Sequence, residues 1–475
     1  MPPSALRPGW IYLALFSWAA SQGRFTALFL QERALSEYQI GILLSLKYVI
    51  SIAVGPTVAS WSNTIVLRGC SYGHTLVMAV CAVLTTLCFL LQAVPELGLF
   101  DAFSEDHLEN RFSYFILIRS LYSACQCSIM PILDGVTLEY LARVKKEKSA
   151  FGSERLFGAV SWAVVSFTLG IAIDHYQTRV MYLYNVCLLL PLLASLYWFE
   201  ISKGKEVEEG SEVDRNDCND CGETSGTDDS AVGPPPPLFA ILRQHVTAST
   251  LVFLLLCTVL SMGTSIVENL VFLMFTNTLG SSNFVCGVSV VVTVVFEIPL
   301  FFYAADMLAY FGPIVMLVIS TLAYSIRVVG YTLVPESSNW MVLLLEPLHG
   351  VTFGCLKISS VEFISQATPA GYDVTVQGLL ASLQGLGSLL GSSVGGFVEQ
   401  RYGSDVLYRG AALIVAVFLG LFMAVFIAEY RRGGVGGGDE RRLAHKSVEL
   451  AGRDVAYSKV QVDDVDETVH SNVSC

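Results

Sequence analysis

Charge is what this 475-residue sequence has least of: Asp, Glu, Lys and Arg make up only 15% of it, and 53% of the residues are hydrophobic. A soluble domain has about a quarter charged residues, so this shortage excludes an ordinary soluble enzyme. The net charge of −13 disfavours a nucleic-acid partner, because the phosphate backbone attracts basic surfaces. The composition therefore predicts an integral membrane protein in contact with the lipid bilayer rather than an enzyme.

Several motifs are absent as well. No G-x-x-x-x-G-K-[S/T] phosphate loop occurs, so an ATP-driven pump is not supported. The apolar stretches are continuous, whereas the strands of a membrane barrel alternate over about ten residues. The twelve cysteines are scattered, and the C-x-x-C pair Cys218 and Cys221 has no second pair of ligands nearby for a structural zinc site. We expect no metal and no cofactor.

The apolar stretches are long enough to cross a bilayer as helices. A helix rises 1.5 Å per residue and needs about 20 residues to cross roughly 30 Å of hydrocarbon. The sequence therefore predicts an all-α membrane protein with twelve transmembrane helices. They are expected at 9–31, 39–60, 73–94, 113–141, 154–173, 178–199, 244–275, 284–305, 311–333, 338–366, 376–398 and 408–430.

A polar segment divides the twelve predicted spans into two groups of six. Residues 1–203 are expected to form an N-terminal six-helix bundle and residues 239–432 a C-terminal one. The acidic linker between them, 204–238, ends in four prolines, and the tail, 433–475, is polar and rich in glycine. Both segments have too little apolar surface to offset the entropy lost on ordering, which predicts disorder.

Lysine and arginine are distributed unequally between the two sides of the predicted membrane. If the N-terminus is cytoplasmic, that side carries eighteen of the 28, the other side five, and the spans five. Cytoplasmic flanks retain Lys and Arg, so both termini and the linker are expected in the cytoplasm. The acidic linker could bind a cytoplasmic partner there. The sequence leaves open whether the membrane is the plasma membrane or an internal one.

Ten ionisable residues lie inside the predicted spans. A charged side chain near the bilayer centre costs about 2.5–3.5 kcal/mol on insertion scales, so each one indicates a partner, a cavity or a function. The alternative for any single residue is a purely structural ion pair. The ten are Arg24, Lys47, Arg119, Asp134, Glu268, Glu297, Arg327, Glu346, His349 and Lys357.

The spacing of these residues suggests a shared face. Glu346, His349 and Lys357 are three and eleven positions apart, so on one helix they project roughly to the same side. Asp134 follows a proline and Glu297 precedes one, where the helix backbone is loosened. Such a face could hold a proton or a polar solute.

Glycine recurs every fourth position in the eleventh predicted span, at Gly387, Gly391 and Gly395. Small residues at this spacing allow helix backbones to approach closely. We therefore expect these glycines to pack against a neighbouring helix.

Four local strings resemble the major facilitator superfamily, and in particular its MFS-1-like branch. They are LSEYQIGILLSL at 35–46; PILDGVTLEYL at 131–141 with FGSERLFGAVSW at 151–162; GVSVVVTVVFEIPLFFYAADML at 287–308; and LLEPLHGVTFGCLKISSVEF at 344–363 with TVQGLLASLQGLGSLLGSSVGGF at 375–397.

The resemblance implies a secondary transporter with two pseudo-symmetric halves that open alternately to each side of the membrane. Carried over by position, it implicates Glu297, Glu346, His349, Asp134 and Arg155.

The sequence departs from the superfamily pattern in one loop. Residues 55–69 contain no acid where the superfamily loop usually has one. The pseudo-equivalent loop retains Asp306. We take Arg155 and Asp306 as gating candidates.

The sequence as a whole predicts alternating-access transport of a small polar or amphipathic organic solute, coupled to protons as a symport. The proton-coupling candidates are Glu297, Glu346, His349 and Asp134. The candidates for substrate contact or countercharge are Arg24, Arg119, Arg327, Lys357 and Glu268. Two alternatives stay open: a facilitator without ion coupling, and a receptor or accessory membrane protein on a transporter scaffold.

Overall fold

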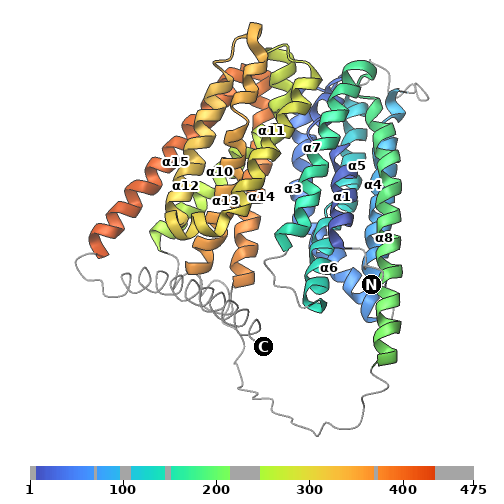
Figure 1. Cartoon of the computed structure of the whole chain (residues 1–475). Helices are drawn as coiled ribbons and strands as arrows, with labels where there is room; N and C mark the ends of the chain where they lie inside the picture. The colour runs from blue at the N-terminus through green and yellow to red at the C-terminus, as the bar shows by residue number, and fades with distance from the viewer. Residues whose placement is uncertain are drawn as a thin grey trace, which may run out of the picture.

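The computed structural model describes residues 7–68, 72–96, 108–144, 151–213, 247–367 and 373–433, and these residues contain helices and no strands. The helices form two groups that stand side by side, the first coloured blue to green and the second yellow to red (Figure 1). The all-helical class predicted from the sequence is confirmed.

Within the described residues, the first group contains eight α-helices and a short 3₁₀ helix, Val94–Glu96. The α-helices are α1 (Pro8–Ala20), α2 (Thr26–Gln31), α3 (Glu37–Leu67), α4 (Gly73–Leu91), α5 (Leu108–Gln126), α6 (Ile129–Arg143), α7 (Phe151–Tyr176) and α8 (Val180–Val213). The second group contains α10 (Ala248–Leu273), α11 (Asn283–Phe302), α12 (Ala304–Tyr331), α13 (Pro347–Ala367), α14 (Asp373–Tyr402) and α15 (Ser404–Gly433). A π-helical turn, Met274–Thr278, continues α10, and a 3₁₀ helix, Glu336–Leu344, precedes α13.

Nine helices of the described ranges are long and apolar enough to cross a membrane, and the bent pair of the 3₁₀ helix and α13 makes a tenth. The other two predicted spans are also helical, as α1 with α2 and as α14. The first is interrupted, and small and polar residues lower the mean hydropathy of α14. The chain is thus a multi-pass membrane protein, and the count of twelve spans stays a prediction.

Three of the predicted spans are broken rather than continuous. The first is interrupted at residues 21–25, the fourth between α5 and α6, and the tenth between the 3₁₀ helix and α13, where the axis bends by 41°. Pro131 lies in the first turn of α6 and Pro347 opens α13. Proline fits the first turn of a helix but disfavours helical geometry in the residue before it, which explains the position of the last break.

Most of the predicted linker and tail lies outside the described residues, and their boundaries stay predictions. Helix α8 continues to Val213, ten residues into the segment predicted as linker, and α15 ends at Gly433. Residues 214–246, with Cys218 and Cys221, and residues 434–475 lie outside the described residues. The disorder of both segments stays a prediction.

Glycines bring the two halves together at one end of the molecule. A Cβ atom added to Gly396 of α14 would lie 2.5 Å from the carbonyl oxygen of Glu37 and 2.9 Å from the Cα of Gly41 on α3. A Cβ added to Gly170 of α7 would lie 2.5 Å from the carbonyl oxygen of Asn283 on α11. Both contacts lie where α3 and α11 begin, which we call the upper end after its place in Figure 1.

The glycines of α14 also pack as the sequence predicts. Cβ atoms added to Gly387 and Gly391 would lie 2.1 Å and 2.2 Å from the carbonyl oxygens of Thr258 and Met262 on α10. Such distances are too short for a side chain, so the two backbones touch directly.

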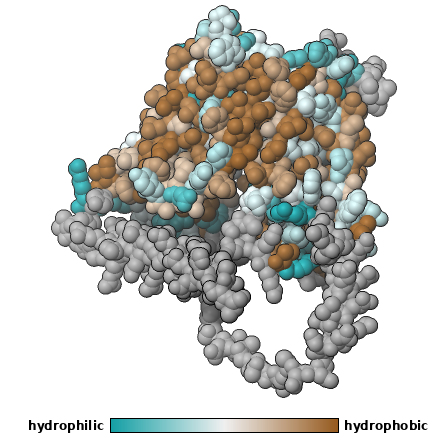
Figure 2. Space-filling view, viewed as in Figure 1, coloured by the Kyte–Doolittle hydropathy of each residue, from teal (hydrophilic) through white to brown (hydrophobic). Residues whose placement is uncertain are grey.

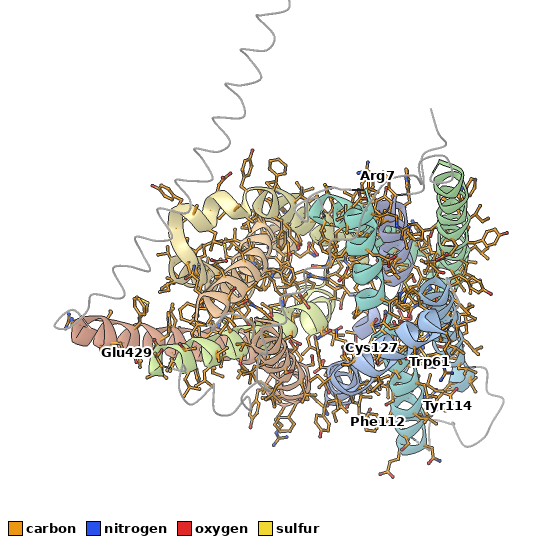
Figure 3. All side chains as sticks on the ribbon, turned by 90° about the horizontal axis from the view of Figure 1, so that it is seen from below. Arg7, Trp61, Phe112, Tyr114, Cys127 and Glu429 are labelled. Carbon is orange, nitrogen blue, oxygen red and sulfur yellow. The ribbon has the colours of Figure 1, made fainter. Side chains whose placement is uncertain are left out.

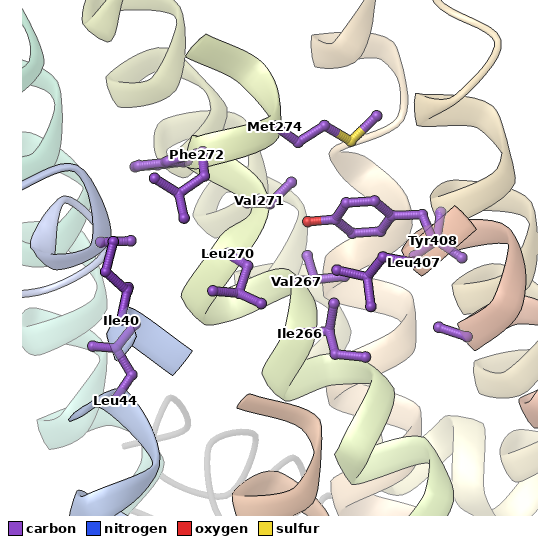
Figure 4. Packing of buried hydrophobic residues seen from close by; sticks show 14 of the residues in the cluster. Ile40, Leu44, Ile266, Val267, Leu270, Val271, Phe272, Met274, Leu407 and Tyr408 are labelled. Carbon is purple, nitrogen blue, oxygen red and sulfur yellow. The ribbon is translucent and has the colours of Figure 1, made fainter. Parts of the chain in front are cut away.

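One apolar core extends through both halves. Ile40 and Leu44 of α3 lie on one side of α10, and Leu407 and Tyr408 of α15 lie on the other (Figure 4). The sides of the molecule are also apolar, whereas hydrophilic residues gather toward its ends (Figure 2). This distribution suits a protein whose sides face lipid.

Candidate functional site

The site is built around the break in the first span. The sequence Ser21-Gln22-Gly23-Arg24 interrupts an otherwise apolar stretch, and helix α1 ends there. Gly23 lies against the ring of Trp162 on α7, because an added Cβ would be 2.7 Å from it. Gln22 is only 5% exposed, and neither its amide nitrogen nor its amide oxygen has a partner in the described part of the chain. Polar side chains at a broken span are typical of transporter binding sites.

Glu346 is the centre of a buried polar cluster in the second half. Its Oε2 accepts hydrogen bonds from Arg327 Nη2 at 2.8 Å and from Thr293 Oγ1 at 2.9 Å, and its Oε1 accepts one from the Tyr331 hydroxyl at 2.7 Å. The carboxylate and the guanidinium are each 1% exposed. The donors come from α11 and α12, and the break before α13 turns Glu346 toward them.

His349 connects this cluster to the first half. Its Nδ1 lies 2.5 Å from Arg327 Nη1, and its Nε2 lies 3.2 Å from Arg24 Nη2. A neutral imidazole can accept at one ring nitrogen only, so one of the two guanidiniums faces a ring N–H. A protonated ring would place a third positive charge between the two arginines. The arrangement therefore suits a neutral His349.

Two other acidic candidates of the second half, Glu297 and Glu268, are less constrained. Within the described residues, the carboxylates of Glu297 and Glu268 form no hydrogen bond and no ion pair. Glu297 is half-buried and is attracted electrostatically by Arg24 and Arg155 and repelled by Glu268.

Lys357 indicates that solvent reaches the interior. Its Nζ donates to Gln384 Oε1 at 2.9 Å, and the side chain is exposed. Yet it interacts electrostatically with Glu268 of α10, Arg155 of α7 and Tyr48 of α3, which belong to both halves. We infer that water reaches the space between the halves at this level.

Asp134 and Arg155 lie together in the first half. The Tyr12 hydroxyl donates to Asp134 Oδ1 at 2.6 Å, and Arg155 Nη1 lies 3.9 Å from Asp134 Oδ2. The structural alternative for Asp134, neutralisation of a nearby cation, therefore fits its position.

Two candidates lie apart from these groups. Arg119 of α5 is 4% exposed and stacks over the Tyr122 ring at 4.5 Å, with no ion pair to a carboxylate of the described ranges. Asp306 is exposed in the first turn of α12 and likewise forms no ion pair with a described residue. No contact connects either of them to Glu346 or His349.

Several polar groups stand out only in the structure. Asn269 of α10 accepts from Lys47 Nζ at 3.0 Å and donates to the hydroxyl of Tyr48 at 3.2 Å, which joins α3 to α10 across the halves. Glu154 is fully buried, pairs with Arg7 at 2.7 Å and caps the backbone N–H of Gly9. Its hydrogen bond holds the pKa of Arg7 above the ordinary value. Seen from below, Arg7 lies in the first half and Glu429 lies at the far end of the second (Figure 3).

Polar contacts join the halves at the upper end as well. Asp174, near the end of α7, accepts from the backbone N–H groups of Asn283 and Phe284 at 2.9 and 2.8 Å and so caps the first turn of α11. Gln400, near the end of α14, accepts from the backbone N–H of Tyr38 at 3.0 Å in the first turn of α3. Together with the glycine contacts, these caps close the upper end.

No group of three or more His, Cys, Asp and Glu side chains in the described ranges could hold a metal ion.

The sequence is similar to known transporters over most of its length. It is 22% identical over 405 residues to the uncharacterised transporter YwbF of Bacillus subtilis, covering 84% of this chain and 87% of that protein. It is 23% identical over 425 residues to the maltose permease of Geobacillus stearothermophilus, covering 88% and 93%.

Solved structures show the same fold. The nucleoside transporter NupG matches with a TM-score of 0.65 at 14% identity, over 89% of this chain and 98% of that one. A D-xylose–proton symporter matches with a TM-score of 0.55 at 13% identity, over 87% and 95%. The fold is that of the major facilitator transporters, which are not enzymes. The model of the MFS_1-like family matches residues 9–410, and the chain belongs to this family of membrane transporters.

Proposed function

We propose that the protein is a secondary active transporter that moves a small polar or amphipathic organic solute by alternating access, in symport with protons. The observation that carries the proposal is the contact between Arg24 and His349, which joins the two halves beside the buried Arg327–Glu346 pair. A polar contact between halves that move relative to one another changes with each transport cycle, so it can couple binding to movement. The names of the similar proteins, which include a sugar permease and a proton symporter, support a solute of this class.

Glu297 is the best proton carrier among the four candidates. It can take up or release a proton without breaking a hydrogen bond to a described residue, whereas Glu346 would first have to lose Arg327. Burial opposes its charged form most strongly and Glu268 adds to this, whereas Arg24 and Arg155 stabilise it. Movement of the halves changes the distance to Arg24 and Arg155, and with it the affinity of Glu297 for a proton.

His349 and Glu346 then act as the part of the site that senses which state the halves adopt. Asp134 is assigned a local role beside Arg155, and Arg327 acts as countercharge to Glu346. The closed upper end and the exposed charges of Arg155 and Lys357 suit a state open toward the opposite end. By the distribution of Lys and Arg, that end faces the cytoplasm.

Uptake into proteoliposomes tests the proposal. Radiolabelled maltose, uridine, D-xylose and benzoate would each be offered with and without an imposed inward proton gradient. We expect accumulation of at least one of them to require the gradient, and Glu297→Gln to abolish that requirement. Glu139→Gln is the matched control, because Glu139 is exposed and pairs only with Arg143 on the surface.

Uptake that ignores the gradient in the unaltered protein would identify an uncoupled facilitator. Unchanged gradient dependence in Glu297→Gln would remove this residue from the proton pathway.

A further inference from the structure

We infer that the transported solute carries a carboxylate, and that this group binds to Arg24 and His349 at the break in the first span. The inference rests on the proposed function, since it names the chemical class of solute for the same site. It depends on three observations: an arginine without an ion-pair contact in the described ranges, an unfavourable pair of donors, and a buried amide without partners.

The first observation concerns the charged groups around His349. Arg24 and Arg327 contribute two positive charges around His349, and Glu346 contributes one negative charge. Glu346 is held by Arg327, and no carboxylate in the described ranges forms an ion pair with Arg24. One Nη of Arg24 is buried and has no hydrogen-bond partner there. Glu297 attracts Arg24 electrostatically but forms no hydrogen bond or ion pair with it. A buried donor without an acceptor is costly, so a monovalent anion in direct contact with Arg24 would stabilise this site.

The donor geometry shows where that anion would bind. Arg327 Nη1 lies close to Nδ1 of His349, so we assign Nδ1 as the acceptor and place the ring proton on Nε2. The Nε2–H then faces Arg24 Nη2 at 3.2 Å, so two hydrogen-bond donors lie next to each other without an acceptor. A carboxylate oxygen placed beside this pair, within hydrogen-bond distance of both nitrogens, would accept from both, and the second oxygen would accept from the free Nη1. Arginine matches carboxylates in this two-pronged way.

The surroundings favour an organic acid over an inorganic anion. Gln22 lies in the same break and offers a donor and an acceptor that are buried and unpartnered. The Trp162 ring packs against Gly23, and the rings of Phe25 and Phe272 meet across the halves at 5.0 Å. Aromatic rings packed at both sequence neighbours of Arg24 suit a small molecule with an apolar body and one carboxylate.

Thermal unfolding of the full-length protein in detergent tests this inference. Three acids would be compared with their neutral amides at equal concentration: benzoate with benzamide, nicotinate with nicotinamide, and lactate with lactamide. A ligand that binds only the folded state raises the unfolding midpoint. We expect at least one acid to raise it while its amide and inorganic phosphate do not. If no acid exceeds its amide, the inference is wrong.

Substitutions at Arg24 locate the binding. Arg24→Gln is expected to weaken binding of that acid about tenfold or more, and Arg24→Lys to retain part of it, because a lysine keeps the charge but not the fork of donors. Arg143→Gln serves as the matched control at the exposed surface. Equilibrium dialysis with radiolabelled acid measures the same affinity directly, so a loss of stability in the Arg24 variants does not obscure the result. Unchanged affinity in Arg24→Gln would overturn the assignment.

The two proposals fail in different ways. Gradient-driven uptake of a neutral solute, with no acid binding, would overturn the carboxylate and leave proton-coupled transport intact. Binding of an acid that never enters proteoliposomes would support the site and contradict transport of that class.

Discussion

The carboxylate of Glu346 takes hydrogen bonds from three side chains on two neighbouring helices, and it does so without access to water. Removing one partner of a buried pair leaves the other charge uncompensated, at a cost of about 3–5 kcal/mol. We therefore expect Glu346→Gln to lower the free energy of unfolding by an amount of this order. Thermal unfolding followed by circular dichroism in detergent measures it.

The double variant Arg327→Met with Glu346→Leu provides the control, since it removes both charges together. It should be more stable than Glu346→Gln, because no charge stays buried alone. A double variant that is less stable than the single one would contradict this account of the pair.

At the level of residues, the sequence could nominate the charges but not their partners. Arg327, Glu346 and His349 stand out because charge is rare inside a span. Thr293 and Tyr331 do not, because hydroxyl groups are common in membrane helices and only the fold shows which of them reach a carboxylate. Gln22 could have been found, since it lies in the polar interruption of an apolar stretch.

At the scale of elements, the two halves form hydrogen bonds to one another at helix ends. Asp174 of α7 caps the first turn of α11, and its negative charge also suits the positive end of that helix. Replacing it with alanine removes a cap worth about 1 kcal/mol. We expect Asp174→Ala to speed hydrogen exchange at the amides of Asn283 and Phe284 by about fivefold, as measured by mass spectrometry.

Asp405→Ala is the control for that experiment. Asp405 lies in the first turn of its own helix, α15. It is exposed and pairs only with Arg409 on the same helix. Its replacement should leave α11 unchanged. Equal effects of the two substitutions on the α11 amides would contradict a specific role for Asp174.

A second prediction concerns Gly391, at the contact of α14 with α10. An alanine Cβ there would lie 2.2 Å from the carbonyl oxygen of Met262, so α10 and α14 would have to move apart. Gly420 of α15 has nothing within 4 Å of the same position. We expect Gly391→Ala to lower the unfolding midpoint and Gly420→Ala to leave it unchanged or raise it, because alanine favours helix by about 1 kcal/mol. If Gly391→Ala does not lower the unfolding midpoint, the two helices are not in direct backbone contact.

The sequence predicted the positions of the elements better than their continuity. Long apolar stretches identify the helices because any membrane span needs them. The breaks depend on local chemistry, and the Glu346–Pro347 step carries a usable signal because proline restricts the residue before it. The fourfold glycine spacing correctly predicted close packing of α14, whereas its partner α10 could be identified only from the fold.

For the whole molecule, the contact between halves at the upper end depends on glycines that lie far apart in the sequence. Gly41 meets Gly396, and Gly170 meets Gly287. A leucine at Gly396 would have to displace the backbone of α3, so Gly396→Leu is expected to hold the upper end open. Uptake into proteoliposomes should fall to background, while binding of a ligand in detergent persists. Gly420→Leu is the control, and normal uptake by Gly396→Leu would contradict the idea that this end must close.

Composition alone predicted a helical membrane protein with two halves, because the charge shortage and the polar linker are visible in the sequence. It could not predict which helices join the halves. Pairs such as α3 with α14 are visible only in the structure, because their contacting residues, Gly41 and Gly396, lie far apart in the sequence.

The tight contact of α7 with α11 has a chemical consequence for the cysteine beside it. Cys286 follows the capped residues of α11, precedes Gly287 and is 0% exposed, and it interacts electrostatically with Asp174. In a variant that keeps this thiol alone, a membrane-impermeant maleimide added on the upper side could react only when the packing around the buried thiol opens to that side. The labelling rate would then report the fraction of time that the transporter spends open to that side, and Asp174→Ala should raise it. Cys286 thus provides an internal probe of the transport cycle.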